Sequence, residues 1–465
     1  MKKKEMRINA FDMNSIGHIS PGLWSHPRDG TVNYKTMQHW LDLAKTLERG
    51  KFDALFIADV LGVYDVFRGN ADAALSSAVQ VPINDPFVLV PAMAAVTKNL
   101  CFGLTGTLTY EPPYTFARRI STLDHLTDGR LAWNIVTGYL NSAAQGLGMA
   151  KQDKHDDRYD IAEDYMEVVY KLWEGSWEDD AVVNDKTTQR YVDPAKVHKV
   201  QHSGKYYQLD AFHLCEPSPQ RTPILFQAGA SKRGVEFAAK HAECVFIFGP
   251  SKTVVKKTVD NIRRLAVSCG RDPESIIIFT VLTVITGRTD GEAQDKLEDY
   301  KQYISLDGAM ALFGGWTGVD MSRYNLDDPI KYVESDAIQS FVEGFTVADP
   351  DKVWTVREVA EWVGIGGIGP VLVGGPETIA DELEGWVRDT GVDGFNLAYA
   401  LCPESFVDFA DLVVPVLQAR GLFKHDYAPG TMREKIYGVG RNRLSADHPG
   451  ARFGTVRKNL QDVAE

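Results

Sequence analysis

The sequence has few of the features that mark secreted, metal-binding or nucleic-acid-binding proteins. Its five cysteines are scattered and form no C-x-x-C pair, so we expect neither a disulfide framework nor a structural zinc site, and a reducing compartment is the default. The formal net charge of −13 provides no basic field that would attract nucleic acid or an anionic membrane surface.

Long apolar runs are also lacking. The longest, Ile276–Ile285, is interrupted by threonines and falls well short of the roughly 20 residues that span a bilayer. The basic start Met1–Met6 is followed by a stretch that is too short and polar for a signal peptide. Together with the cysteine pattern, these absences predict a cytoplasmic protein that binds neither nucleic acid nor membrane.

What the chain has instead is a repeated alternation of apolar runs with helical patterns. Helical spacing is clear in Tyr34–Arg49, Tyr114–Leu126 and Lys252–Ser268. Repeated strand–helix units predict a parallel sheet with helices outside, and eight units predict a (β/α)8 barrel of the TIM type. An open doubly wound sheet is the alternative, disfavoured by the count and by the lack of a glycine fingerprint after the first strand. The eight predicted strands are Arg7–Phe11, Ala54–Val60, Cys101–Tyr110, Arg130–Thr137, 223–227, Cys244–Phe248, Ser275–Ile285 and Gly394–Ala400.

The chain is longer than the about 250 residues of a bare barrel. We therefore expect one barrel over residues 1–420 with insertions at about 175–221 and 305–373. A C-terminal extension over 421–465 would wrap the surface or a partner subunit. In the second insertion, Phe313–Tyr324 combines glycines with Trp316, which predicts a lid with a glycine hinge and a tryptophan cover. A packed surface loop is the alternative.

Residues Thr222–Glu243 are predicted to form a strand, a tight turn of small residues and a helix. The turn, Gln227–Ser231, would leave backbone N–H groups open at the start of the helix, beside the positive end of its dipole. Ser231 adds a hydroxyl and Arg233 a charge, so the turn predicts a phosphate site. The alternative is an ordinary turn with Ser231 as the helix N-cap.

Other motif matches are incomplete. Gly364–Gly369 fits G-x-G-x-x-G, but Pro370 and another apolar segment follow where the dinucleotide fingerprint needs a helix, so we interpret it as a loop. Gly229-Ala230-Ser231 lacks the final glycine of a nucleophile elbow, since residue 233 is Arg. No metal site is predicted, because three histidines of the first insertion lack a complete ligand set and are interpreted as solvated: His198, His202 and His213.

The ends of the predicted strands carry mostly neutral polar groups, at the place where a barrel builds its active site. With one carboxylate and neither a carboxylate pair nor a metal cluster, this set suits an uncharged heterocycle that carries a phosphate better than it suits hydrolysis. The residues are Asn14, His18, Asp59, Thr105, Thr107, Thr109, Asn134, Thr137, Tyr139, Gln227–Ser231, Asn396 and Tyr399.

These residues stand in long blocks that resemble the bacterial-luciferase-like flavin monooxygenases. The branch that is most similar contains the nitrilotriacetate, dibenzothiophene-sulfone, dimethyl-sulfide and long-chain-alkane monooxygenases. The resemblance runs from about Arg7 to Arg443. The blocks that carry it are INAFDMNSIGHISPGLWSHP, LERGKFDALFIADV, ARRISTLDHLTDGRLAWNIVT, HDDRYDIAEDYMEVVYKLWEGSWEDDA, DPAKVHKVQHSGKYY and PSPQRTPILFQAGASKRGVEFAAKHAE.

The resemblance implies a TIM barrel that uses FMN in reduced form, FMNH2, supplied by a separate NAD(P)H:flavin reductase. O2 would add to the flavin as a C4a-hydroperoxide and oxygenate a small apolar or organosulfur substrate, such as a sulfide, sulfone or alkane. A homodimer or homotetramer is also implied. An F420-dependent oxidoreductase on the same fold and a non-catalytic flavin carrier are the alternatives.

The resemblance also assigns residues. Asp59 would contact the edge of the isoalloxazine ring, and Thr137 would hydrogen-bond the flavin. The rest of the expected cofactor set is Thr105, Asn134, His155, Tyr159, Ala228, Gly229, Ala230 and Ser231. The side chains that would orient the peroxide or the substrate are His18, Tyr64, Gln80 and Tyr139. Among these, His18 is the best candidate for proton transfer, because its reference pKa lies near neutrality.

Three positions depart from the alkane-oxidising relatives. Those relatives carry Cys where this chain has Ser15, and His where it has Tyr139, and a further pocket His near Leu312 is missing. These departures count against alkane hydroxylation and leave the flavin chemistry in place.

Overall fold

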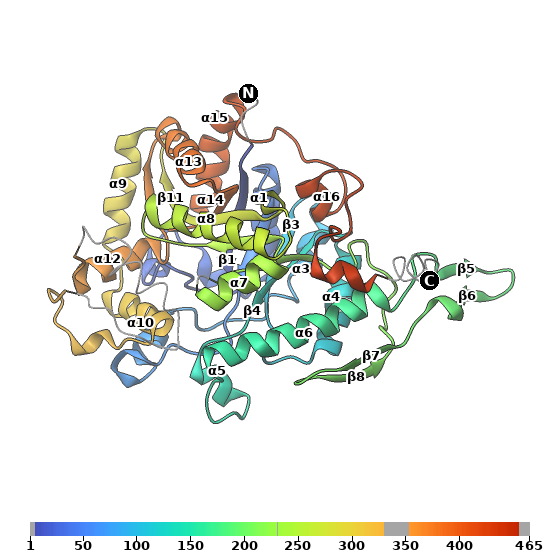
Figure 1. Cartoon of the computed structure of the whole chain (residues 1–465). Helices are drawn as coiled ribbons and strands as arrows, with labels where there is room; N and C mark the ends of the chain where they lie inside the picture. The colour runs from blue at the N-terminus through green and yellow to red at the C-terminus, as the bar shows by residue number, and fades with distance from the viewer. Residues whose placement is uncertain (1–4, 230, 330–352, 455–465) are drawn as a thin grey trace.

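The computed structural model describes residues 5–229, 231–329 and 353–454, which form a closed parallel barrel (Figure 1). Each strand pairs with the next around the ring, and the last pairs with the first. The strands, in order around the barrel, are β1 (Arg7–Met13), β2 (Ala54–Ala58), β3 (Cys101–Thr107), β4 (Leu131–Val136), β9 (Ile224–Gln227), β10 (Cys244–Ile247), β11 (Ile277–Thr286) and β13 (Gly394–Ala398). The eight predicted strands and the predicted barrel are confirmed.

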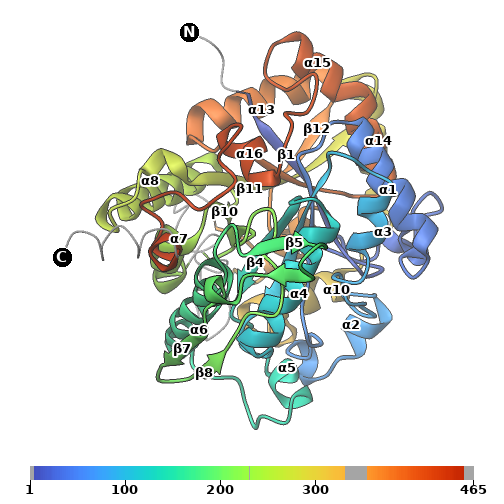
Figure 2. The ribbon, with the colours of Figure 1, turned by 90° about the vertical axis from the view of Figure 1, so that its right-hand side faces the viewer.

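Helices cover the outside of the barrel, as Figure 2 shows for α1, α4, α6, α8 and α13. The covering helices are α1 (Met37–Arg49), α3 (Val90–Ala95), α4 (Pro113–Leu126), α6 (His155–Gly175), α7 (Lys232–His241), α8 (Lys252–Ser268), α13 (Pro376–Thr390), α14 (Glu404–Asp408) and α15 (Val414–Ala419). Shorter or inserted helices are α2 (Asp72–Ser76), α5 (Asn141–Gly146), α9 (Asp290–Lys301), α10 (Leu306–Thr317), α12 (Val356–Gly366) and α16 (Met432–Tyr437). Within the described residues, no helix is long and apolar enough to cross a bilayer.

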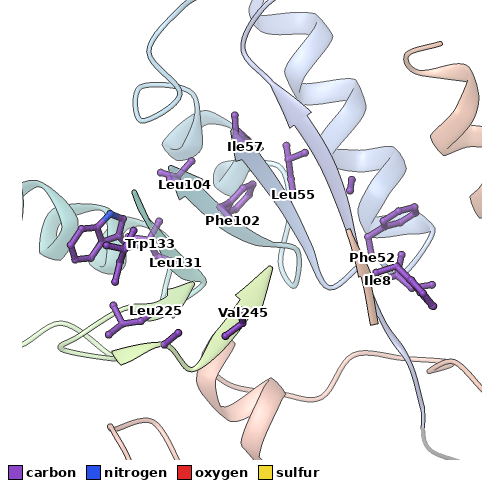
Figure 3. Packing of buried hydrophobic residues seen from close by; sticks show 14 of the residues in the cluster. Ile8, Phe52, Leu55, Ile57, Phe102, Leu104, Leu131, Trp133, Leu225 and Val245 are labelled. Carbon is purple, nitrogen blue, oxygen red and sulfur yellow. The ribbon is translucent and has the colours of Figure 1, made fainter. Parts of the chain in front are cut away.

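The strands bury both of their faces. Outward-facing side chains such as Leu55 and Phe102 pack beneath the helices in one large cluster (Figure 3). Inward-facing aromatic rings fill the barrel, with Phe56 and Phe226 5.3 Å apart between ring centroids. Burial on both faces explains why the strands appear in the sequence as continuous apolar runs rather than alternating ones.

The two insertions differ in kind. The first folds into two antiparallel hairpins, β5–β6 (Val182–Asp185, Arg190–Val192) and β7–β8 (Val200–Ser203, Gln208–Ala211), and the β5–β6 hairpin extends from the body at the right of Figure 1. The second contains α10, α12 and a short ninth strand, β12 (Val371–Gly374), which pairs with the second half of β11.

The predicted lid at Phe313–Tyr324 is wrong. Residues up to Thr317 belong to the buried helix α10, and Trp316 is only 5% exposed. The glycines serve close packing rather than a hinge, since a Cβ at Gly315 would lie 1.8 Å from the ring of Tyr64. The loop expected at Gly364–Gly369 is also wrong in its first half, because α12 ends at Gly366 and Gly367 adopts a left-handed φ of 58°.

The C-terminal segment lies across the N-terminal ends of the strands. Helix α16 places Arg433, which is fully buried, against Glu243 at the start of β10. The same guanidinium donates to the carbonyls of Thr222 and Pro223, just before β9, with both distances 3.0 Å. The chain itself therefore covers this end of the barrel, over a cavity of about 150 Å³ that is lined by residues such as Asn9, Lys424 and Met432.

Candidate active site

The opposite end of the barrel, where the strands finish, opens into a pocket. Its wall is formed by side chains that follow β2, β3, β4 and β9 and by the first turn of α6. Of the predicted cofactor residues, the described ones that line it are Asp59, Thr105, Asn134, Thr137, His155, Tyr159, Ala228, Gly229 and Ser231. Ala230 lies outside the described residues.

The floor of the pocket contains buried polar atoms with unused hydrogen-bonding capacity. Asn134 donates through Nδ2 to Thr105 Oγ1 at 2.9 Å. Its Oδ1, and the Oε1 of Gln227, have no hydrogen-bond partner among the described residues. A buried acceptor left unpaired costs about 1–3 kcal/mol. Such atoms are typical of a site that is completed by a ligand.

The start of α7 closes one end of the pocket. Ser231 caps this helix by accepting from the Gly234 amide at 3.1 Å. A Cβ at Gly229 would lie 2.3 Å from Gln227 Nε2, and one at Gly234 would lie 2.7 Å from Tyr159 Oη. Glycine is thus needed for the backbone to approach these side chains. Arg233, which was expected to add charge here, pairs with Asp160 at 2.8 Å instead.

Helix α6 contributes a face that the sequence analysis recognised only in part. His155, Arg158 and Tyr159 all line the pocket. Arg158 was missed; it is 2% exposed and donates to the carbonyl of Gly138. The spacing of three and four residues from His155, which places side chains on one helix face, could have identified it.

Asp59 is the carboxyl group of the pocket. Burial raises its pKa to about 7, and the nearby charge of Asp85 adds to the effect. The carboxyl therefore changes its charge near neutral pH, which suits a group that faces an uncharged ring.

A smaller cavity of about 120 Å³ adjoins the pocket and shares Asp59 and Tyr139 with it. The predicted catalytic side chains meet here. Tyr64 Oη donates to Gln80 Oε1 at 2.7 Å and lies 2.9 Å from Tyr139 Oη. Gln80 Nε2 donates to the His18 carbonyl at 2.9 Å. Tyr64 stands behind the wall and holds the other two in place.

His18 is buried beside Phe11, with ring centroids 4.4 Å apart. Burial lowers its pKa to about 3, well below the reference value on which its choice for proton transfer was based. Its Nδ1 has no hydrogen-bond partner among the described residues. His18 therefore presents a neutral imidazole to the cavity.

Some strand-end residues serve other purposes. Thr109 donates to the Thr137 carbonyl at 2.6 Å, and Asn14 donates to the Asp85 carbonyl at 3.1 Å. Asn396 pairs with Asn9 at 2.8 Å inside the barrel. The sequence analysis also missed the apolar walls, because single aromatic residues in apolar strands give no sign of facing inward. These wall residues are Phe11, Phe56, Tyr110, Phe246 and Phe248.

Of the histidines of the first insertion, His198 is exposed, as expected, and contacts Glu178 at 2.8 Å. His202 contacts Asp164 at 2.7 Å and His213 contacts Ser121 at 2.9 Å. Both are buried, so the expectation that they are solvated is wrong. Across residues 5–229, 231–329 and 353–454, no group of three or more His, Cys, Asp or Glu side chains could hold a metal ion.

Comparisons with known proteins find similar sequences and structures over most or all of the chain. The model of the luciferase-like monooxygenase family matches residues 17–394. A dimethyl-sulfide monooxygenase from Hyphomicrobium sulfonivorans is 51% identical over 100% of this chain and 96% of its own length. A long-chain alkane monooxygenase from Geobacillus thermodenitrificans is 49% identical over 98% of this chain and all of its own length. A crystal structure of a riboflavin lyase with modified FMN and riboflavin has a TM-score of 0.91 and 35% identity, covering 97% of this chain and 100% of that one.

Proposed function

The chain belongs to the luciferase-like monooxygenase family, and we propose that it is a two-component monooxygenase that uses reduced FMN and O2. Its substrate is a small apolar or organosulfur molecule. The observation that carries this proposal is a single pocket that joins the Ser231 end of α7 to Asp59 and Tyr139 across the barrel mouth.

The residues present fit FMN. The helix start at Ser231, with glycines at 229 and 234, suits a phosphate, because open backbone N–H groups and the helix dipole favour an anion. The unpaired acceptors of Asn134 and Gln227 suit the donors of a ribityl chain or a flavin edge. Aromatic and aliphatic walls suit the flat ring.

When bound, reduced FMN supplies the two electrons with which O2 gives one oxygen atom to the substrate and the other to water. The protein's part is to bind, orient and exclude water. Tyr139 and Gln80 are fixed through Tyr64 at the border of the two cavities. His18 remains neutral there and is placed to hydrogen-bond a polar atom of the reacting group without adding charge.

The remaining parts of the proposal concern partners and location. A separate NAD(P)H:flavin reductase delivers FMNH2 by diffusion, and the reaction takes place in the cytoplasm, where NAD(P)H is available. The protein is a homodimer or homotetramer, which light scattering on the purified protein would measure.

The test begins with equilibrium titration of the purified protein with FMNH2 under anaerobic conditions. FMNH2 from an unrelated flavin reductase is then supplied with 18O2 and small sulfides or alkanes, and 18O in the product is measured by mass spectrometry. We expect FMNH2 to bind and one labelled oxygen atom to appear in the product. Failure of FMNH2 to bind, or binding without any labelled product across the substrate series, would overturn the proposal. Reduced F420 serves as the control cofactor.

A further inference from the structure

The small cavity is lined in part by side chains that have no role in the proposed chemistry. Beyond the residues that it shares with the larger pocket, it is lined by Met13, His18, Ile19, Gln80 and Trp316. Its volume of about 120 Å³ is well below the roughly 300 Å³ at which pockets for drug-sized ligands begin. Trp316 is the largest of these side chains, so it decides how far the cavity extends.

Trp316 is held rigidly in this position. Helix α10, which carries it, is buried along its whole second half. The close approach of Gly315 to the ring of Tyr64 fixes the helix against the cavity wall. The indole N–H lies within hydrogen-bonding reach of the hydroxyls of Tyr64 and Tyr139. A side chain held by packing and by two hydroxyls is a fixed wall and not a movable cover.

The other surroundings of the cavity select against an anionic substrate. Met13, Ile19 and Phe248 are apolar, and His18 is neutral. Tyr139 and Gln80 are already bonded to Tyr64. An anionic substrate would lose its hydration without gaining an opposite charge, and it would face the carboxyl group of Asp59, which is strongly unfavourable.

We propose that this cavity is the substrate subsite and that Trp316 sets an upper limit on substrate length. The subsite admits small, weakly polar molecules, because its volume of about 120 Å³ is less than half of the roughly 300 Å³ at which pockets for drug-sized ligands begin. Short dialkyl sulfides belong to this class. The inference depends on the proposed monooxygenase function and adds a substrate limit to it.

The test is a homologous series of dimethyl, diethyl, dipropyl and dibutyl sulfide with FMNH2 and O2. For the wild-type protein, kcat/KM for the oxygenated product should fall at least about 100-fold between diethyl and dibutyl sulfide, since each misplaced methylene costs about 10-fold or more. In W316A the fall should shrink to less than about 10-fold, because the removed indole leaves room for longer chains. W316F keeps an aromatic ring at this position and should retain most of the fall in kcat/KM between diethyl and dibutyl sulfide.

A matched control is W386A on α13. It removes an indole that is also buried, at 4% exposure, from outside both cavities, and should leave the limit unchanged. If W316A fails to fold, the same sulfide series measured with W316L and with the wild-type protein still tests the role of Trp316. Equal kcat/KM for dimethyl and dibutyl sulfide in the wild type, or an unchanged limit in a folded W316A or W316L, would overturn the role of Trp316. Absence of FMNH2 binding and of any product would instead overturn the proposed function.

Discussion

A fully paired buried charge and the unpaired polar atoms of the pocket lie at opposite ends of the barrel. At the N-terminal ends of the strands, Arg433 Nε and Nη2 donate to the two oxygens of Glu243 at 2.7 and 2.8 Å. Its remaining donors reach backbone carbonyls, including those of Gln220 and Asn442. At the C-terminal ends, His18 Nδ1, Asn134 Oδ1 and Gln227 Oε1 have no partner among the described residues.

This difference distinguishes polar groups that stabilise the fold from polar groups that are available to bind a ligand. A buried charge that is fully paired contributes to a unique fold, because removing either partner leaves the other uncompensated. Buried polar atoms without partners weaken the fold, and those that line the open pocket are placed where a ligand can complete them. Variants at the closed end should therefore change stability with little effect on ligand binding. Variants at the open end should change ligand binding, and their effects on stability should be smaller than those at the closed end.

The largest expected effect is at the closed end. R433M should lower the free energy of unfolding by about 3–5 kcal/mol, because Glu243 keeps its burial and loses its counter-charge. Urea unfolding measures this loss. In the double variant R433M/E243L, which removes both charges, much of the stability should return. A single-variant loss below about 1 kcal/mol would show that the ion pair does not hold this end closed.

The next effect concerns Asp59 and pH. Its folded pKa of about 7 lies above the ordinary value of 3.8, so the folded state holds this proton more tightly than the unfolded state. The contribution of the protonated Asp59 carboxyl to the free energy of unfolding is fully present below pH 4 and is lost as the pH rises through 7. D59N removes the pH dependence, so the ligand-free variant should match the wild type at pH 4 and exceed it by roughly 1–3 kcal/mol at pH 8. Equal stability at pH 8 would contradict the burial argument.

Asp59 should also affect the flavin. D59A should weaken FMN binding by about 10-fold or more, as expected when a hydrogen bond to a charged or polarised group is removed. Fluorescence titration with FMN measures the dissociation constant. An unchanged constant would remove Asp59 from the flavin site.

The smallest effect is at the phosphate end. S231A should cost about 1 kcal/mol of stability through the lost N-cap and should also weaken FMN binding. Riboflavin, which lacks the phosphate, should bind S231A and wild type equally well. S251A is the matched control, since Ser251 caps α8 in the same way and is not among the described pocket residues. Loss of FMN affinity equally in both variants would mean that the effect is not local.

Much of the barrel was predictable because parallel strands bury both faces and so appear as apolar runs. Strand ends could then be located, which correctly predicted that Asp59, Asn134 and Thr137 lie in one pocket. The match of helix Lys252–Ser268 to its predicted limits reflects its Ser251 cap and clear periodicity.

The features that could not be predicted from the sequence depend on tertiary packing. Glycines near Trp316 suggested a hinge, whereas in the structure they allow α10 to approach Tyr64. The pKa of His18 depends on burial beside Phe11, which no local pattern reports. Strand β12 was missed because four residues, three of them with intermediate exposure, give too short a signal.

The most direct test of the account is a crystal structure of the protein with FMN bound. We expect the phosphate at the start of α7, within hydrogen-bonding distance of Ser231, and the isoalloxazine ring beside Asp59 with its reactive edge toward His18 and Tyr139. Density for FMN at the closed end near Arg433, or in the open pocket with the phosphate away from Ser231, would contradict it.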